Sequence, residues 1–344
     1  MAKRIRVSAD NGTNWFTLPG STAELAREID GIDDTIFGFD YQSNFPGLIG
    51  WNITSNAYVK GFAGYMAKLK KIGSTTAATG SAMSLVSGKT YQVDQAARQI
   101  WDRSATTVIK VGGTDQTAQV ESIDYLFGRV TFKDSYTVSG AVTADHSYFP
   151  TTEIAKGRSY TLTQTANAID TTDMPTAQAN GGIRTFIYGL KTVELEIGGV
   201  FDATNAYADA LQARDEVIIE INPDGNGESI ARGFFRFTGD SQSGAVGDLE
   251  EETVTLALNV PDDSLMARPF GWQFSSSSTL NAGIRAALNA WQNATEIDVQ
   301  YLPDGETGVA GNAIVSEITL AGELEGMNEF NVTFQGTGAL SDVT

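Results

Sequence analysis

The chain repeats part of its own sequence, and this repeat limits the folds open to it more than any other feature. The tripeptide Pro-Asp-Gly at 223–225 recurs at 303–305, and TVTL at 253–256 matches NVTF at 331–334 at nearly the same spacing. Around each tripeptide the pattern reads helix, strand, turn, strand, acidic loop, strand. Self-similarity with a matched order of elements predicts two copies of one fold.

The front halves of the two copies also resemble each other, since WFTLPGSTAELAREIDGIDDT at 15–35 is similar to SYTLTQTANAIDTT at 159–172. Each copy is therefore split in sequence. We predict a discontinuous domain A, a small inserted module and a domain B; their bounds are 1–75 with 264–344, 76–155 and 156–262. An alternative layout has two consecutive domains, with the block of about 156–260 as an appendage.

The composition between these matches favours a mainly β fold with short helices. Residues 74–83 (STTAATGSAM) read as a small-residue linker, and 84–150 hold short candidate strands of β-branched and aromatic residues, as in a small β-sandwich or barrel. Helices are expected at 203–213 and 279–291. The second has an apolar face, made of Leu280, Ile284, Ala287, Leu288 and Trp291.

Several candidate strands alternate between an apolar and an acidic or small polar face. In KTVELEIGG (191–199), Val193, Leu195 and Ile197 alternate with two glutamates. Alternation places the apolar side chains in a core and the glutamates on the opposite face. Such faces carry almost no lysine. The carboxylates assigned to this acidic face are Glu194, Glu196, Glu317, Glu323 and Glu329.

Charge and composition exclude several classes of function. The net charge of −19 argues against binding nucleic acid by neutralising its phosphates. The chain has no cysteine, which excludes disulfides and thiolate metal sites. It has no apolar run near the roughly 20 residues of a membrane span, so no membrane insertion is expected, and no secretory signal is recognisable.

Motifs for catalysis or for cofactor binding are missing from the sequence. The one histidine, His146, has no neighbouring ligand pattern. Asp224, Asn226 and Glu228 resemble a calcium loop only weakly, and a glycine-rich hairpin turn explains them better. No P-loop, HExxH or GxSxG occurs. We therefore expect no enzymatic activity, no cofactor and no metal.

Two segments carry a resemblance to a known family. The ending GELEGMNEFNVTFQGTG (322–338) and the run TLTQTANAIDTTDM (161–174) are similar to segments of the major tail-tube proteins of long-tailed, siphovirus-type bacteriophages. The resemblance implies two tail-tube-type β-sandwich domains with flanking helices. It also implies a virion tail protein, assembled in the host bacterial cytoplasm, without catalytic residues.

The same resemblance implies the partners. Sheets of neighbouring copies would join into rings, and rings would stack into a tube around the tape-measure protein, between tail-tip initiator and terminator proteins. Genomic DNA would pass through the lumen without specific binding. A duplicated subunit implies trimeric rings with pseudo-sixfold symmetry, with the five glutamates named above facing the lumen.

A long aromatic segment at 36–50 (IFGFDYQSNFPGLIG) is expected to be a loop. Exposed apolar loops often mark contact sites, so Phe39, Tyr41, Phe45 and Leu48 are candidates for contacts between stacked rings. The alternative is that these side chains fill the core of domain A.

Two other functions share the β-rich, cysteine-free composition. One is another virion structural protein, such as a capsid decoration or baseplate subunit, which would need neither duplicated domains nor acidic strand faces. The other is a carbohydrate-binding protein, in which Trp51, Trp101 and Trp272 would form a stacking platform. The scatter of these tryptophans over three blocks disfavours the second function.

Overall fold

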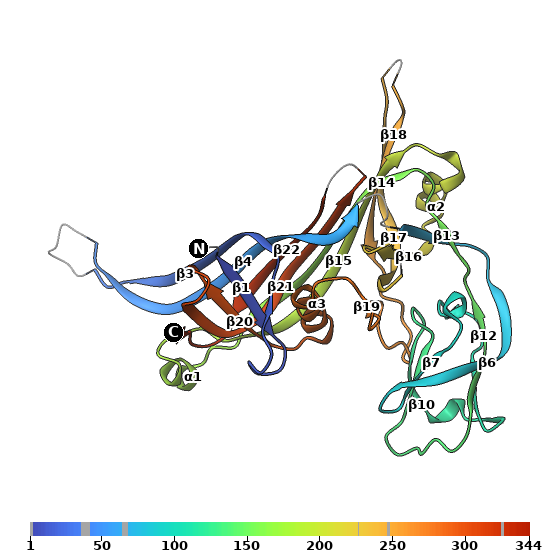
Figure 1. The fold of residues 1–344 in the computed structure, drawn as a ribbon, viewed down its shortest axis with the longest axis horizontal. Helices are drawn as coiled ribbons and strands as arrows, with labels where there is room; N and C mark the ends of the chain where they lie inside the picture. Colours follow the sequence, from blue (N-terminus) through green and yellow to red (C-terminus); the bar gives the residue numbers. More distant parts are fainter. Residues whose placement is uncertain (1–2, 36–41, 64–67, 226, 246–247, 325–326) are drawn as a thin grey trace. The chain divides into compact units, whose positions relative to one another are not determined.

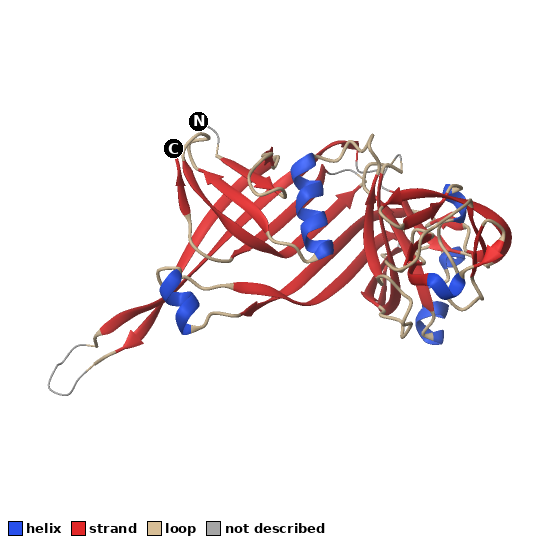
Figure 2. Cartoon of the chain, turned by 90° about the horizontal axis from the view of Figure 1, so that it is seen from below, coloured by secondary structure: helices blue, strands red, loops and turns tan. Residues whose placement is uncertain are grey.

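The computed structural model describes residues 3–35, 42–63, 68–225, 227–245, 248–324 and 327–344. Strands dominate and helices are few and short, which confirms the predicted fold class (Figure 2). The chain forms two compact units, each built from separated segments. The first unit holds Met1–Met66, Ser159–Leu195 and Ser277–Thr344, and the second holds Ala67–Arg158 and Glu196–Ser276.

The first unit is a sheet with one long helix. Its order of neighbouring strands is β3-β4-β22-β21-β14, with β15 beside β14, and β20 and β1 continue from β21. β14 belongs to this unit from Ser159 onward and β15 up to Leu195. The elements are β1 (Arg4–Ser8), β2 (Phe16–Thr17), β3 (Gly20–Asp33), β4 (Asn44–Ala63), β14 (Gly157–Asp170), α1 (Met174–Ala179), β15 (Phe186–Val200), α3 (Ala282–Asn293), β20 (Ile297–Leu302), β21 (Gly308–Glu323), β22 (Met327–Gly336) and β23 (Ser341–Val343).

The helix α3 covers the core of this unit, packed against β1, β2 and β21 (Figure 1). It begins after Asn281, whose side chain caps the helix by accepting hydrogen bonds from the backbone N–H groups of Gly283 and Ile284 at 2.8 and 3.3 Å. The five residues of the predicted apolar face are all buried. The sequence pattern therefore placed both this helix and its inward side correctly.

The second unit contains a seven-stranded sheet, in the order β10-β11-β7-β6-β12-β8-β9, and a further set of strands, in the order β13-β5-β16-β17-β18 with β19 beside β17. Its elements are β5 (Lys68–Ile72), β6 (Thr76–Ser87), β7 (Thr90–Val93), a 3-10 turn (Ala96–Arg98), β8 (Val108–Val111), β9 (Thr114–Asp115), a 3-10 turn (Thr117–Gln119), β10 (Val120–Asp124), β11 (Arg129–Phe132), β12 (Val142–Tyr148), β13 (Thr151–Glu153), a 3-10 turn (Ala203–Asn205), α2 (Tyr207–Ala213), β16 (Glu216–Asn222), β17 (Ser229–Ser243), β18 (Glu251–Leu258) and β19 (Phe270–Phe274).

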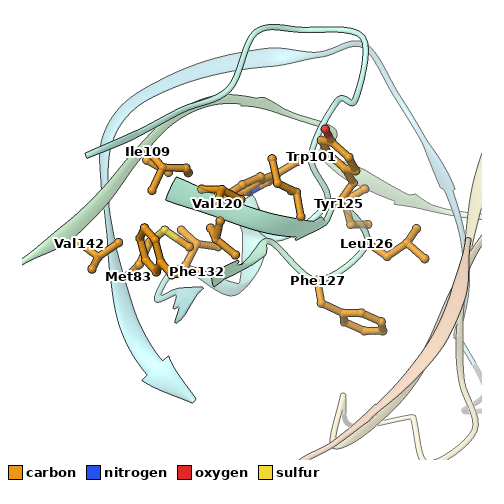
Figure 3. Packing of buried hydrophobic residues seen from close by; sticks show 14 of the residues in the cluster. Met83, Trp101, Ile109, Val120, Tyr125, Leu126, Phe127, Phe132 and Val142 are labelled. Atoms are coloured by element: carbon orange, nitrogen blue, oxygen red, sulfur yellow. The ribbon is translucent and has the colours of Figure 1, made fainter. Parts of the chain in front are cut away.

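The seven-stranded sheet shares one core with β16 and β17, and Figure 3 shows the side chains that the seven-stranded part contributes to it. Trp101, Phe127 and Phe132 are completely buried in this core, together with Ile218 of β16 and Phe234 of β17. The predicted inserted module is thus a folded β structure that packs on strands of the predicted domain B. The module shares its compact unit with residues 196–262 of the predicted domain B, whereas residues 159–195 of that domain belong to the first unit.

The two Pro-Asp-Gly turns have the same hydrogen bond and an equivalent neighbouring strand, in keeping with the predicted duplication, although the loop of the second hairpin is shorter: Ile221 pairs with Ala231 and Tyr301 with Val309. Gly225 N–H donates to Asn222 O at 3.0 Å, and at the second tripeptide Gly305 N–H donates to Leu302 O at 3.1 Å. Asn222 then pairs with Lys68 of β5, as Leu302 pairs with Arg4 of β1. The strand β5 is therefore the counterpart of β1, and it lies in the second unit although residues up to 75 were assigned to domain A.

An irregularity in the following strand pair is also repeated. The register of β17 against β18 shifts between Phe237 and Gly239, and that of β21 against β22 shifts between Val315 and Glu317. The two shifts have the same spacing along the chain as the sequence match between TVTL and NVTF. A shared bulge position is a feature that chance hairpins would not reproduce.

Three local expectations were wrong. The segment 74–83 is not a linker, because it enters β6, where Ala78, Ser81 and Met83 are buried. The predicted loop 36–50 becomes strand β4 at Asn44, because Asn44 and Phe45 pair with Asp33 and Ile32 of β3.

The predicted helix 203–213 is broken. The turn Ala203–Asn205 is separated from α2 by Ala206, whose φ of 52° lies in the left-handed region.

Candidate assembly surface

One face of the first unit is polar over six neighbouring strands. Along β21 and β22, Ile318, Leu320, Phe330, Val332 and Phe334 are buried, and the residues between them point to the other side. The strand period of two explains this separation into a core face and a polar face.

The polar side chains line up in rows that cross the strands. Glu24 of β3 is opposite Thr54 of β4, Thr54 is opposite Thr333 of β22, and Thr333 is opposite Glu317 of β21. Glu317 is then opposite Thr165 of β14, whose hydroxyl lies 2.5 Å from the hydroxyl of Thr192 on β15. Cross-strand neighbours of this kind face one another on one side of a sheet. This row therefore spans six strands.

Neighbouring rows continue the same chemistry. Asn56, Asn331, Thr319 and Thr163 form the next row, and Tyr58, Glu329, Ala321 and Thr161 form the one after. We call this surface the polar face; it comprises Thr22, Glu24, Ala26, Asn52, Thr54, Asn56, Tyr58, Glu329, Asn331, Thr333, Gln335, Glu317, Thr319, Ala321, Glu323, Ser159, Thr161, Thr163, Thr165, Thr192 and Glu194. These residues include carboxylates, amides and hydroxyls, and none is a lysine or an arginine.

Four of the five sequence-assigned carboxylates lie on the polar face, and all four are exposed: Glu194, Glu317, Glu323 and Glu329. Glu196 is also exposed and alternates with buried Leu195 and Ile197, but it stands at the start of the second unit. Only the carboxylates were named as site candidates, but the predicted alternation between an apolar and an acidic or small polar face also covers the hydroxyl and amide residues between them.

The candidates for ring-to-ring contact are only partly described. Phe39 and Tyr41 lie outside the described residues, Leu48 is half-buried, and Phe45 is 61% exposed. Phe45 pairs across the strands with Ile32, which is 55% exposed. The β3–β4 hairpin therefore presents an apolar pair to solvent near its far end.

The alternative sites found in the sequence are buried. Trp51, Trp101 and Trp272 are 2%, 0% and 2% exposed, so they present no ring for stacking on a sugar. The indole N–H of Trp51 donates to Gly338 O at 2.8 Å and that of Trp101 to Arg98 O at 2.9 Å. These tryptophans are core residues.

His146 is buried in the seven-stranded sheet and stacks on Trp101, with ring centroids 4.5 Å apart. Burial lowers the pKa of His146, because the core disfavours the charged imidazolium.

In the turn after β16, Asp224 is buried, and Asn226 lies outside the described residues. Within the described part of the chain, no three His, Cys, Asp or Glu side chains are grouped as metal ligands would be. None of the helices in that part has the length and apolar character of a membrane span.

No protein-family model matches this chain, and no curated protein matches it. Solved chains that are similar to part of it include the following two. One is from the "Tail of empty GTA particle computed with helical refinement, C6 symmetry", at 18% identity, covering 37% of this chain and 87% of that one with a TM-score of 0.30. The other is from the "Virion of native gene transfer agent (GTA) particle", at 17% identity, covering 32% and 85% with a TM-score of 0.29. At such TM-scores, the likeness carries no argument about function.

Proposed function

We propose that this protein is a structural virion subunit that assembles as stacked rings into the tail tube of a bacteriophage. The observation that carries the proposal is the polar face, which spans six strands and has no basic residue among the side chains that the structure describes. A soluble monomer normally mixes both charge signs over its surface. A wall that must let DNA pass without holding it has a reason to omit lysine and arginine.

The duplication supports a ring. A sheet with open edges is prone to join other sheets, and closure into a barrel removes such edges. Two copies of one fold per chain give six equivalent positions in a ring of three chains, so a trimer with pseudo-sixfold symmetry is the proposed state. The polar face would line the lumen, with Glu194, Glu317, Glu323 and Glu329 on it.

The partners follow from this role. The tape-measure protein would occupy the lumen during assembly, and DNA would pass through it at ejection. Tail-tip and terminator proteins would begin and end the tube. Phe45 and Ile32, exposed near the end of the β3–β4 hairpin, are the proposed contact between stacked rings.

Electron microscopy of the concentrated protein tests the proposal, with class averages viewed along the ring axis. Rings or tubes with a central channel and threefold or pseudo-sixfold symmetry are expected. Six full-length chains per ring would keep the tube and exclude the trimer. Particles that remain monomeric, even with tail-tip proteins present, would contradict the proposal and favour a decoration or baseplate subunit.

A further inference from the structure

One strand pairing inside the chain joins its two repeated halves. In the first unit, β14 is antiparallel to β21, with Ser159 opposite Glu323 and Thr165 opposite Glu317. Because β22 also pairs with β21 over Glu317–Ala321, β14 must occupy the other edge of β21. The strands β14 and β21 come from different copies of the repeat. Each therefore has a counterpart in the other copy, and the pairing of these two counterparts can be derived from that of β14 with β21.

The hairpin β3–β4 is the counterpart of the hairpin β14–β15. Thr35 N–H donates to the Asp33 carboxylate at 2.9 Å and Ser43 N–H donates to the Thr35 hydroxyl at 2.9 Å. The same two bonds recur after β14, from Thr172 N–H to Asp170 at 2.8 Å and from Thr185 N–H to the Thr172 hydroxyl at 2.9 Å. Aligning Asp33 with Asp170 makes residues 22–28 of β3 correspond to 159–165 of β14.

The counterpart of β21 is β17, by the alignment that their shared bulge defines. Residues 317–321 of β21 thus correspond to 239–243 of β17. At these positions β17 pairs with β18 on one edge, while its pairing with β16 on the other edge ends at Arg236. Within the described residues, β3 pairs only with β4. Therefore β3 and β17, the counterparts of β14 and β21, each have an edge to which no described strand is paired.

On their core sides, these two edges have side chains of opposite charge nearby. On β17, Asp240 and the neighbouring Glu252 of β18 lie on the core side, where Oδ1 of Asp240 is buried and has no hydrogen-bond partner in the described structure. Burial, and then the negative charge of Asp240, raise the pKa of Glu252. On β3, Arg27 is exposed although its position in the alternation, between Leu25 and Ile29, belongs to the core side.

We propose that β3 of one copy pairs antiparallel with β17 of a second copy, and that Arg27 neutralises the Asp240–Glu252 pair there. Transferring the β14–β21 register places Ala26 opposite Ser241 and Arg27 opposite Asp240. Gln164, the counterpart of Arg27, is completely buried, so this pairing also buries Arg27. The interface is heterologous, and such an interface, repeated from copy to copy, forms a ring when its rotation closes, as the proposed trimer requires. The inference deepens the proposed function and rests on it.

Cysteine cross-linking tests the register, and the chain offers a clean background because it has no cysteine. Directly opposed residues of antiparallel strands have Cα atoms about 4.5–5.5 Å apart, within disulfide reach. A mixture of Ala26→Cys protein and Ser241→Cys protein should give a covalent dimer under oxidation. Neither variant alone should cross-link, because the interface is not self-complementary. The matched control is a mixture of Ala26→Cys protein with Gln242→Cys protein, in which the second cysteine is one position out of register.

A charge exchange tests the role of Arg27. Arg27→Asp or Asp240→Arg alone should raise the concentration needed for assembly about 30-fold or more, since each leaves like charges together in the interface. The double variant should assemble at nearly the wild-type concentration. If a single substitution acted instead by damaging the fold, adding the second substitution would not restore assembly.

Microscopy of the same samples separates this inference from the proposed function. Rings without the Ala26–Ser241 cross-link, or with the out-of-register control reacting equally well, would overturn the pairing and leave the tube function standing. Cross-linked chains without rings or tubes would support the pairing and contradict the tube. Monomers without a cross-link would contradict both.

Discussion

Arg232 of β17 and Glu220 of β16 form an ion pair of 2.7 Å whose side chains are only 6% and 3% exposed. The Arg232 guanidinium also donates to Leu126 O at 2.8 Å and lies 5.1 Å from the centre of the Phe127 ring. Arg268 lies over the same ring and pairs with Asp124 at 2.7 Å. These contacts attach the seven-stranded sheet to the strands β16 and β17 within the second unit.

Glu220→Gln should destabilise the protein by about 3–5 kcal/mol, because it leaves the Arg232 charge buried without a counter-charge. Urea unfolding followed by tryptophan fluorescence measures the change. Glu121→Gln is the control, since Glu121 is exposed on β10 of the same unit, and it should change stability by less than about 0.5 kcal/mol. Equal effects of the two substitutions would show that the buried ion pair is not important for stability.

Gly336→Ala should destabilise the first unit by about 1–3 kcal/mol. A Cβ added at Gly336 would overlap the indole ring of Trp51, which is buried and held by its hydrogen bond to Gly338 O. Gly50→Ala is the control, because the nearest atom to its new Cβ is Cδ of Arg184, at 3.9 Å, an ordinary contact distance. Thermal unfolding of both variants provides the comparison, and a Gly336→Ala protein as stable as the control would contradict the close packing on Trp51.

Acid should weaken the seven-stranded sheet through His146. Burial is the main cause of its lowered pKa; the charge of Arg98 acts in the same direction and that of Asp145 opposes it. The unfolded chain therefore binds a proton more readily than the folded one. The stabilisation by neutral His146 is complete above the unfolded pKa of about 6.5 and is lost as the pH falls from there toward the folded pKa.

His146→Phe keeps an aromatic ring against Trp101 and removes the titration. Its melting temperature should therefore fall less than that of the wild type between pH 7 and pH 5. Because His146 is the one histidine of the chain, no second imidazole complicates the comparison. Parallel pH curves for the two proteins would exclude a contribution from His146.

Positive charge on the polar face should convert a non-binding wall into a DNA-binding one. Glu317→Lys with Glu329→Lys should still assemble, because both side chains are exposed and point away from the core. The assembled variant should retain DNA in a salt-dependent manner, with a slope that steepens by about 0.9 for each phosphate contact. Co-sedimentation of assembled particles with DNA measures this.

The control is a variant with the same change of charge at another place, Glu121→Lys with Glu153→Lys. Both of these glutamates are exposed in the second unit. DNA retention by these particles to the same degree would argue that net charge alone, and not the position of the polar face, controls binding.

Much of the candidate surface could be predicted because it depends on local periodicity. Alternation in KTVELEIGG, SEITLAGE and MNEFNVTF was enough to assign Glu194, Glu317 and Glu329 to one exposed side of their strands. Arg27 was missed, although a charged residue between Leu25 and Ile29 breaks the apolar alternation of β3.

By itself, the sequence determined the mainly β fold, the helix α3 with its buried face, and the repeated order of elements around the two Pro-Asp-Gly turns, because side-chain periodicity and turn residues act over a few positions. Only the tertiary structure decided which strands are neighbours: that β5 pairs with β16, that β14 joins β21, and that β3 and the end of β17 have an edge to which no other described strand is paired. Strand pairing depends on contacts between residues far apart in the chain, and many registers satisfy the same local pattern.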